Sequence, residues 1–261
     1  MNDPLFSLGR KGAASFKVSS ANVLRTVDAV HDAYTRHRSA RWVIADSNAL
    51  TLFASAVQAH DTWHRVLFLE RASMPRRELL HSLFRVVIAP HDGVHLLPAE
   101  ELKEVLADDG AEDLLIGGVV DPDDRAVVVY RGNLDRLVVP FDWFRPRPRG
   151  PRPDFKSLAV IDSGQTIRLG DYEAATDALL YEFDAAARRR MRRQEVRDDS
   201  SFGGALRRLR LQKGLERSAF APLSAKTIAR IERGEVREPH DGTLSAIAAR
   251  LGVAPWRIKS Y

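Results

Sequence analysis

The spacing of apolar residues changes along this chain, and each change predicts a different kind of element. Residues 20–38 place Val23, Val27, Val30 and Tyr34 three or four positions apart, which is the spacing of one helical face. Further on, short continuous apolar runs alternate with stretches of helical spacing. The expected strands are residues 41–45, 65–69 and 85–89, and the expected helices are residues 48–60, 75–84 and 98–106. This alternation predicts an α/β or α+β layered structure.

From residue 114 the pattern becomes one of short β-branched runs separated by turn signals. The runs are residues 114–120, 126–131 and 136–141, with DPDD and Gly132-Asn133 between them. They predict a small antiparallel meander. Two further runs, residues 158–161 and 166–169, precede helical spacing at residues 172–183. The N-terminal and middle region is therefore expected to be α+β, with small mixed or antiparallel sheets.

A basic amphipathic helix is predicted at residues 224–234, SAKTIARIERG. Ser224 is a good N-cap, and Gly234 is typical of the position just after a helix. Ile228 and Ile231 share one face, and the opposite face carries Lys226, Arg230 and Arg233 beside small alanines. A short helix with an apolar back and a basic front has the size and charge to enter the DNA major groove.

Several short helices are expected around this one. They are residues 205–213, residues 215–221 with Phe220 facing inward, and residues 243–251, followed by a last turn that starts at Pro255. Val253 and Trp256 are expected to close the core. Together these elements predict that an all-α five-helix domain follows the α+β region.

The order of these segments resembles the Cro/C1-type (XRE-family) helix-turn-helix domain of bacterial and phage regulators. The matching text is L-R-x-L-R-x-x-x-G-L, then S-x-x-T-I-x-R-I-E-x-G, then P-x-x-x-T-L-x-x-I-A-x-x-L-G-V, over residues 201–258. The chain departs from the family pattern between Leu215 and Ser224, where it is about three residues shorter and carries Pro222.

The resemblance implies roles for individual residues. Ala225, Lys226 and Arg230 take the base-facing places of the family, and Glu232 matches its acidic residue, which is expected to be structural. The positions that face DNA phosphates are Arg217, Ser224, Thr227, Arg233 and Arg237.

Residues 126–183 resemble, less closely, a small bacterial domain family that has no assigned activity. The block that carries the resemblance is Val139-Pro140-Phe141-Asp142-Trp143-Phe144, followed later by Gly170-Asp171-Tyr172-Glu173. Members of that family often lie near toxin–antitoxin genes or beside a DNA-binding domain. The resemblance implies an accessory or protein-contact role.

The charge of the chain is unevenly distributed. The net charge is +5, but residues 200–261 carry 12 Lys and Arg against 5 Asp and Glu, so residues 1–199 carry −2. Positive charge concentrated on the segment with the motif is what phosphate neutralisation requires. The chain has no cysteine, which excludes disulfides and thiolate metal sites and fits a cytoplasmic protein. No run of 18 apolar residues predicts a membrane span.

Two other arginine-rich stretches have alternative readings. One stretch alternates arginine with proline, and it is either a nucleic-acid contact or a stiff solvated linker. Its arginines are Arg145, Arg147, Arg149 and Arg152. The run RRRMRR at residues 188–193 either contacts flanking phosphates or forms a solvated linker helix.

Candidate catalytic or metal-binding residues are sparse. His60 and His64, and His91 and His95, are each four positions apart, and Asp46, Glu70 and Asp92 stand near strand ends. No complete catalytic constellation and no phosphate-cradling glycine loop is found. We therefore expect no enzyme, no metal and no cofactor.

The sequence predicts a cytoplasmic, sequence-specific DNA-binding regulator, most simply an autoregulatory repressor that binds double-stranded DNA as a homodimer. One alternative is the antitoxin of a toxin–antitoxin pair, with a toxin as partner. The other is a DNA-targeted enzyme with a catalytic N-terminal region. The expected divisions are a loose arm at residues 1–19, an α/β domain at 20–112, a β-rich domain at 113–183, a basic linker helix at 184–200 and the DNA-binding domain at 201–261.

Overall fold

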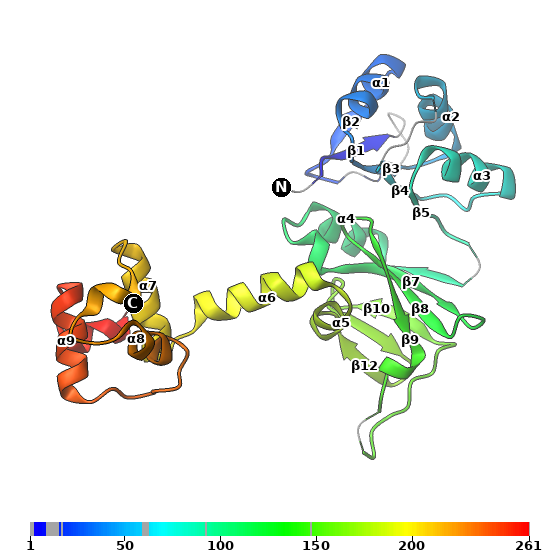
Figure 1. The fold of residues 1–261 in the computed structure, drawn as a ribbon. Coiled ribbons are helices and arrows are strands. Elements are labelled where there is room, and N and C mark those ends of the chain that lie inside the picture. Colours follow the sequence, from blue (N-terminus) through cyan, green and yellow to red (C-terminus); the bar gives the residue numbers. More distant parts are fainter. Residues whose placement is uncertain are drawn as a thin grey trace. The chain divides into compact units, whose positions relative to one another are not determined.

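The structure is a computed structural model in which the chain forms two compact units, Met1–Ala185 and Ala186–Tyr261. It describes residues 3–8, 16, 18–58, 63–91, 93–146 and 148–260. Within this described part there are nine α-helices, four 3-10 helices and three β-sheets (Figure 1).

The first sheet of the N-terminal unit has five parallel strands in the order β2-β1-β3-β4-β5. The strands are β1 (Leu5–Leu8), β2 (Asn22–Leu24), β3 (Arg41–Ile44), β4 (Arg65–Phe68) and β5 (Val86–Ile88). Helices α1 (Val27–Arg36), α2 (Ser47–Ala56) and α3 (Met74–Leu83) connect β2 to β3, β3 to β4 and β4 to β5. These three crossovers all run in the same direction across the sheet, so right-handed connections place the three helices on one face.

The core of this layer lies between the sheet and the three helices. Alternate strand residues point into it, and Trp42, Ile44 and Phe68 are all 0% exposed. Helical residues such as Tyr34 and Phe53 meet them with ring centroids 6.3 and 4.9 Å from Trp42. The opposite face of the sheet is also buried, since Val43, Leu67 and Ile88 are 0% exposed. Burial on both faces explains why these strands are continuous apolar runs and do not alternate with polar residues.

The second part of the N-terminal unit contains two antiparallel sheets. One has the order β6-β7-β8-β9 and the other β10-β11-β12. The meander expected at residues 114–141 is confirmed by the pairing of β7 with β8 and of β8 with β9. The elements are β6 (Val94–Leu96), α4 (Ala99–Ala107), η1 (Ala111–Asp113), β7 (Leu115–Asp121), β8 (Ala126–Arg131), β9 (Arg136–Pro140), η2 (Phe141–Trp143), β10 (Leu158–Ile161), β11 (Thr166–Leu169), β12 (Tyr172–Ala175) and α5 (Thr176–Phe183).

The two antiparallel sheets meet at a glycine. The amide of Leu115 donates to the carbonyl of Gly164 at 3.0 Å. Gly164 has φ +87°, and a Cβ on it would lie 2.3 Å from the carbonyl oxygen of Leu115. Only glycine combines this backbone conformation with so close an approach.

The expected fold class is wrong. The first sheet is parallel and has five strands, so the chain is mixed α/β and is not an α+β region followed by an all-α five-helix domain. The C-terminal unit contains three α-helices and two 3-10 helices beside the longer α6 (Ala185–Asp198). The five-helix expectation treated each short apolar stretch as an α-helix, whereas segments of four to six residues close only 3-10 turns here.

Two elements near the N-terminus differ from what the sequence predicted. Leu5–Leu8, expected in a loose arm, is instead a buried strand that pairs with both β2 and β3. The helix expected from residue 20 starts only at Val27, because Thr26 caps it by accepting from the amide of Ala29 at 3.3 Å. The residues before that cap form β2. The helix expected from Tyr172 is likewise preceded by a strand, β12.

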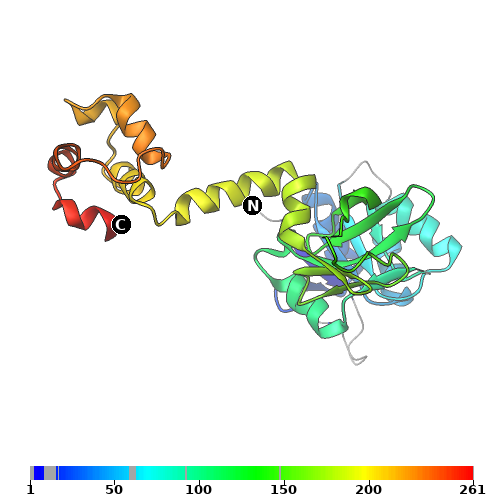
Figure 2. The same ribbon diagram turned by 90° about the horizontal axis from the view of Figure 1, so that it is seen from below.

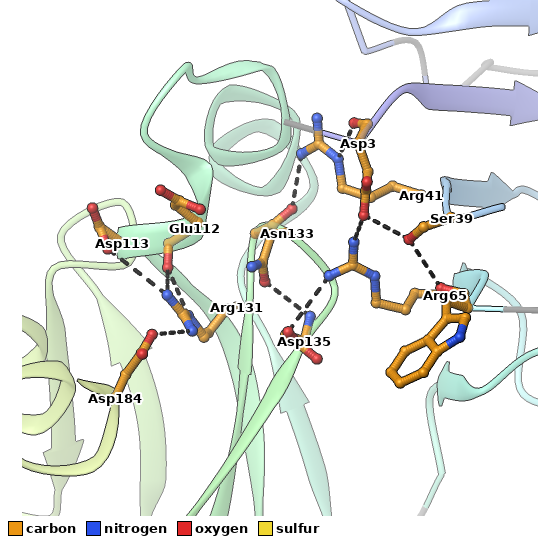
Figure 3. A network of polar contacts seen from close by, with 12 residues as sticks. Asp3, Ser39, Arg41, Arg65, Glu112, Asp113, Arg131, Asn133, Asp135 and Asp184 are labelled. Atoms are coloured by element: carbon orange, nitrogen blue, oxygen red, sulfur yellow. Dashed lines mark hydrogen bonds and ion pairs between the residues drawn. The ribbon is translucent and has the colours of Figure 1, made fainter. Parts of the chain in front are cut away.

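Buried arginines connect the parallel sheet to the turn between β8 and β9 (Figure 3). Arg41, on β3, donates to the carbonyls of Asp3 at 3.2 Å and Gly132 at 3.3 Å. Arg65, on the neighbouring strand β4, is ion-paired with Asp3 and lies 3.6 Å from the Asp135 carboxylate. Arg41 is therefore satisfied by backbone carbonyls, and the charge of Arg65 is compensated by two carboxylates.

A third arginine of this region holds α5 and η1 in place. Arg131, at the end of β8, lies 2.8 Å from the Asp184 carboxylate and 3.7 Å from that of Asp113. It also donates to the backbone carbonyl of Glu112 (Figure 3).

His64 makes the stability of this unit depend on pH. Its ring is 0% exposed, its Nε2 lies 3.1 Å from the carbonyl oxygen of Tyr34, and its Nδ1 has no hydrogen-bond partner among the described residues. Burial disfavours the imidazolium and lowers the pKa of His64 below its ordinary value of 6.5. In the unfolded chain the same ring takes up a proton near pH 6.5. The folded state should therefore lose stability as pH falls below that value, by at most about 1.4 kcal/mol per pH unit, until the folded pKa is passed.

Urea unfolding of the wild type at about pH 7.5 and about pH 5.5 measures this loss. His64→Phe keeps an aromatic ring beside Tyr34 and Trp42 and removes the titration. The variant should be less stable at the higher pH but should lose less stability between the two. An equal loss in both proteins would contradict the role of His64.

Candidate nucleic-acid interface

The expected basic helix is α8 (Ala225–Glu232). Ser224 caps it by accepting from the amide of Thr227 at 3.1 Å. Gly234, with φ +74°, ends it in the left-handed conformation that favours glycine. Ile228 and Ile231 are 0% and 1% exposed, so the apolar back of α8 is buried as expected. Ala225, Lys226 and Arg230 are exposed on its other side.

Four other elements share one apolar core with α8, and Figure 2 shows the C-terminal unit that they form. They are α7 (Phe202–Gln212), η3 (Arg217–Phe220), α9 (Asp241–Leu251) and η4 (Pro255–Ser260). Phe220, expected to face inward, is 1% exposed. The expectation for Trp256 is wrong, because this side chain is 77% exposed and Ile258, at 0%, fills the core from the last turn.

A glycine lets α7 approach the end of α8 closely. A Cβ on Gly203 would lie 2.2 Å from the carbonyl oxygen of Ile231. The backbones of the two helices therefore touch at this point, and any larger residue would push α8 outward.

A buried carboxylate fixes the base of α8. The Glu232 side chain is 1% exposed and accepts from Arg210 Nε at 2.5 Å and from Arg217 Nε at 2.8 Å. Arg210 also donates to the carbonyl of Leu215 at 2.8 Å, so it links α7 and α8 to the segment that leads into η3. The structural role expected for Glu232 agrees with this position. Arg217 was expected to face a phosphate, and the structure holds it against Glu232 with 42% of its side chain exposed.

Glu235 contacts two of the expected DNA-facing arginines. Its carboxylate lies 3.1 Å from Arg230 Nε and 2.7 Å from Arg233 Nε. The hydrogen bond from Arg233 lowers the pKa of Glu235, with a smaller contribution from Arg230. The turn at Gly234 folds the chain back so that the amide of Glu235 donates to the carbonyl of Arg230 at 3.0 Å. This reversal explains the contact, which the linear spacing of the residues does not suggest.

The remaining expected contact residues are more open. Lys226 and Arg237 are exposed and have no acidic partner among the described residues. Ser224 and Thr227 stand together at the start of α8, with their hydroxyl oxygens 2.9 Å apart.

A shallow groove of about 540 Å³ runs from the end of α7 to the start of α8. It is lined by Arg210, Leu211, Gly214, Leu215, Glu216, Arg217, Ser218 and Ala225. Ala225, one of the expected base-facing residues, therefore stands at the end of a concave surface.

Three of the candidate catalytic or metal-binding residues, Asp46, Glu70 and His64, have structural roles. Asp46 caps α2 by accepting from the amide of Ala49 at 2.8 Å, and Glu70 accepts from the amide and hydroxyl of Ser47 at 2.9 and 2.5 Å. His64 lies in the core. His60, Asp92 and Arg147 are outside the described residues. Among the residues that are described, no cluster of three or more His, Asp or Glu side chains is arranged to hold a metal ion.

Two further observations bear on the surroundings of the protein. No helix in the described ranges is both long and apolar enough to cross a membrane. The charge divides between the two units, since residues 186–261 carry 18 Lys and Arg against 8 Asp and Glu, a net +10, and residues 1–185 carry −5.

Comparison with known proteins gives no match to a family model, a curated protein or a solved structure. The resemblance to the Cro/C1-type domain therefore rests on the residues of the motif alone.

The buried ion pairs predict a large effect of one substitution. Glu232→Ala leaves the Arg210 guanidinium buried without its carboxylate, and we expect the C-terminal unit to lose roughly 3–5 kcal/mol of unfolding free energy. Glu238→Ala is the matched control, because Glu238 is exposed and has no partner among the described residues. Urea unfolding of the two variants makes the comparison, and equal stability would contradict the role given to Glu232.

Proposed function

We propose that the C-terminal unit binds double-stranded DNA and that the protein is a sequence-specific transcriptional regulator. The observation that carries the proposal is α8 itself. It is a short helix whose apolar side is buried and whose exposed side carries Lys226 and Arg230, within a unit of net charge +10. A helix of this size fits the major groove, and the positive unit lowers the free energy of approach to the phosphates.

In this proposal the residues of α8 divide between bases and backbone. Lys226 and Arg230 reach the acceptor atoms of guanine, and Ala225 contacts a thymine methyl group. Ser224 and Thr227 lie at the start of the helix, where hydroxyl and amide groups suit a phosphate oxygen. Arg233 and Arg237 approach phosphates beyond the end of the helix. Arg217 makes a phosphate contact with the part of its guanidinium that Glu232 leaves exposed.

One short helix reads only a few base pairs, so useful specificity normally requires two copies on a roughly palindromic site. We therefore propose a homodimer, with the N-terminal unit as its dimerisation or partner-binding part. Occupation of a promoter by such a dimer blocks transcription. The simplest form is a repressor that acts on its own gene in the cytoplasm.

The proposal is tested by binding of the full-length protein to duplex DNA from upstream of its own gene, against random duplex of equal length. Lys226→Ala should weaken binding to the upstream duplex by about 1–3 kcal/mol and reduce the preference over random DNA. Arg250→Ala serves as control, since Arg250 is an exposed residue of α9 in the same unit. If the wild type shows no preference, or if Lys226→Ala matches the control, α8 is not the reading helix.

Glu235 predicts a substitution that strengthens binding. Its carboxylate competes with phosphate for Arg230 and Arg233. Glu235→Gln removes the negative charge and frees both guanidinium groups, so affinity should rise and the salt slope should become steeper by about one. Titrations over a salt series measure both quantities. Unchanged or weaker binding would mean that neither arginine meets DNA.

A further inference from the structure

A second groove of the C-terminal unit is lined almost wholly by arginine. It lies between α6 and α7, has a volume of about 440 Å³, and is lined by Arg192, Arg193, Arg197, Arg207, Arg208 and Leu211. Arg193 and Arg197 are four positions apart on α6, and Arg207 and Leu211 are four apart on α7. Residues four apart share a helical face, so the two helices turn these faces toward a common space.

The corner between α6 and α7 is held by hydrogen bonds that leave positive charge in the groove. Arg208 donates from Nη1 to the carbonyls of Arg197 at 2.9 Å and Asp199 at 2.6 Å. Ser201 caps α7 by accepting from the amide of Gly204 at 3.1 Å. Backbone carbonyls orient the guanidinium of Arg208 without cancelling its charge, and the nearby Asp199 carboxylate offsets part of it.

Two of the lining arginines, Arg193 and Arg207, contact no carboxylate in the described part of the chain. Arg197 lies 3.6 Å from the Asp198 carboxylate. The guanidinium of Arg193 donates to the carbonyl of Arg189 at 3.1 Å, and Arg207 has no acidic partner among the described residues. Five like charges around one space repel one another, and an anion of several charges would relieve that repulsion.

The lining selects among anions. Planar guanidinium groups bind phosphate oxygens in a bidentate manner. Leu211 is 58% exposed and adds an apolar surface, which the methylene stems of the arginines extend. A sugar–phosphate backbone presents both chemistries, with charged phosphates and apolar sugar faces in alternation. A free inorganic phosphate presents only one.

Leu211 also lines the groove that reaches Ala225. The arginine groove and the groove that reaches α8 therefore adjoin at Leu211 on α7. We infer that the groove between α6 and α7 binds the phosphodiester backbone of duplex DNA beyond the base pairs that α8 would read. This inference rests on the proposed DNA binding of the same unit, but it concerns different residues and needs no specific sequence.

The test uses the full-length protein and random-sequence duplexes of about 12 and about 30 base pairs over a salt series. For the Arg193→Gln, Arg207→Gln double variant we expect a salt slope lower by about two on the longer duplex, and an affinity lower by roughly tenfold or more at about 0.1 M salt. The Lys213→Gln, Arg250→Gln double variant removes the same charge from exposed residues that do not line the groove. Compared with the groove variant, this control should keep more of the increase in affinity that the wild type shows when the duplex is lengthened.

Two outcomes would overturn the inference. In the first, the groove variant gains as much affinity from the longer duplex as the wild type does. In the second, inorganic tripolyphosphate binds the wild type but not the groove variant, while duplex affinity is unchanged, which would assign the groove to a small polyphosphate.

The proposed sequence recognition by α8 and the proposed backbone binding by the groove can fail separately. Lys226→Ala alters the preference for the upstream duplex, whereas the groove variant lowers affinity for every sequence. Circular dichroism of each variant establishes that the helices are retained, so that a loss of binding is not a loss of fold.

Discussion

The position of α8 depends on one buried carboxylate. Glu232 sits at the end of the helix with its side chain 1% exposed, and it is held by Arg210 from α7 and Arg217 from η3. Arg210 is itself fixed by the carbonyl of Leu215. A buried carboxylate with fewer partners would be costly, and a buried guanidinium without it would be equally so. The three elements are therefore tied to one another in a single arrangement. The close backbone contact at Gly203 leaves little room for another one.

Arginines with fixed partners are also found in the N-terminal unit, where those on neighbouring strands meet acceptors from a distant part of the chain. Arg41 and Arg65 stand at the start of β3 and β4, and their partners are Asp3 and the turn between β8 and β9. Charged residues at the ends of apolar strands thus connect the parallel sheet to the antiparallel one. Residues that are distant in sequence compensate each other, and the sequence alone does not indicate which ones will meet.

The sequence predicts best where a local signal is complete. For α8, the cap at Ser224, the pair Ile228 and Ile231 and the stop at Gly234 are all within eleven residues, and each is found as expected. The meander of β7, β8 and β9 has similarly clear turns. The strand Leu5–Leu8 gives no such signal, because four apolar residues become a central strand only through pairing with β2 and β3. The parallel order of the first sheet is likewise a property of distant pairings.

At the candidate interface, too, contacts between residues that the fold brings together are not evident from the sequence. Lys226 and Arg230 are exposed as the helical spacing predicts, but the contact of Glu235 with Arg230 and Arg233 follows from the chain reversal at Gly234. The arginines of α6 stand out in the sequence, whereas their common groove with Arg207 and Arg208 depends on the corner between two helices. Charge can be counted from a sequence, but the side chains that share or neutralise it are decided by the fold.

The exposed position of Trp256 gives the C-terminal unit its own optical reporter. It is the one tryptophan in residues 186–261, and its indole is 77% exposed, whereas Trp42 in the N-terminal unit is 0% exposed. A solvated indole emits at longer wavelength and is open to collisional quenchers such as acrylamide, while a buried one is shielded from them. Trp63 of the N-terminal unit is also exposed, but only to 46%, so a quencher acts most strongly on Trp256 and events at the C-terminal unit can be followed without attaching a dye.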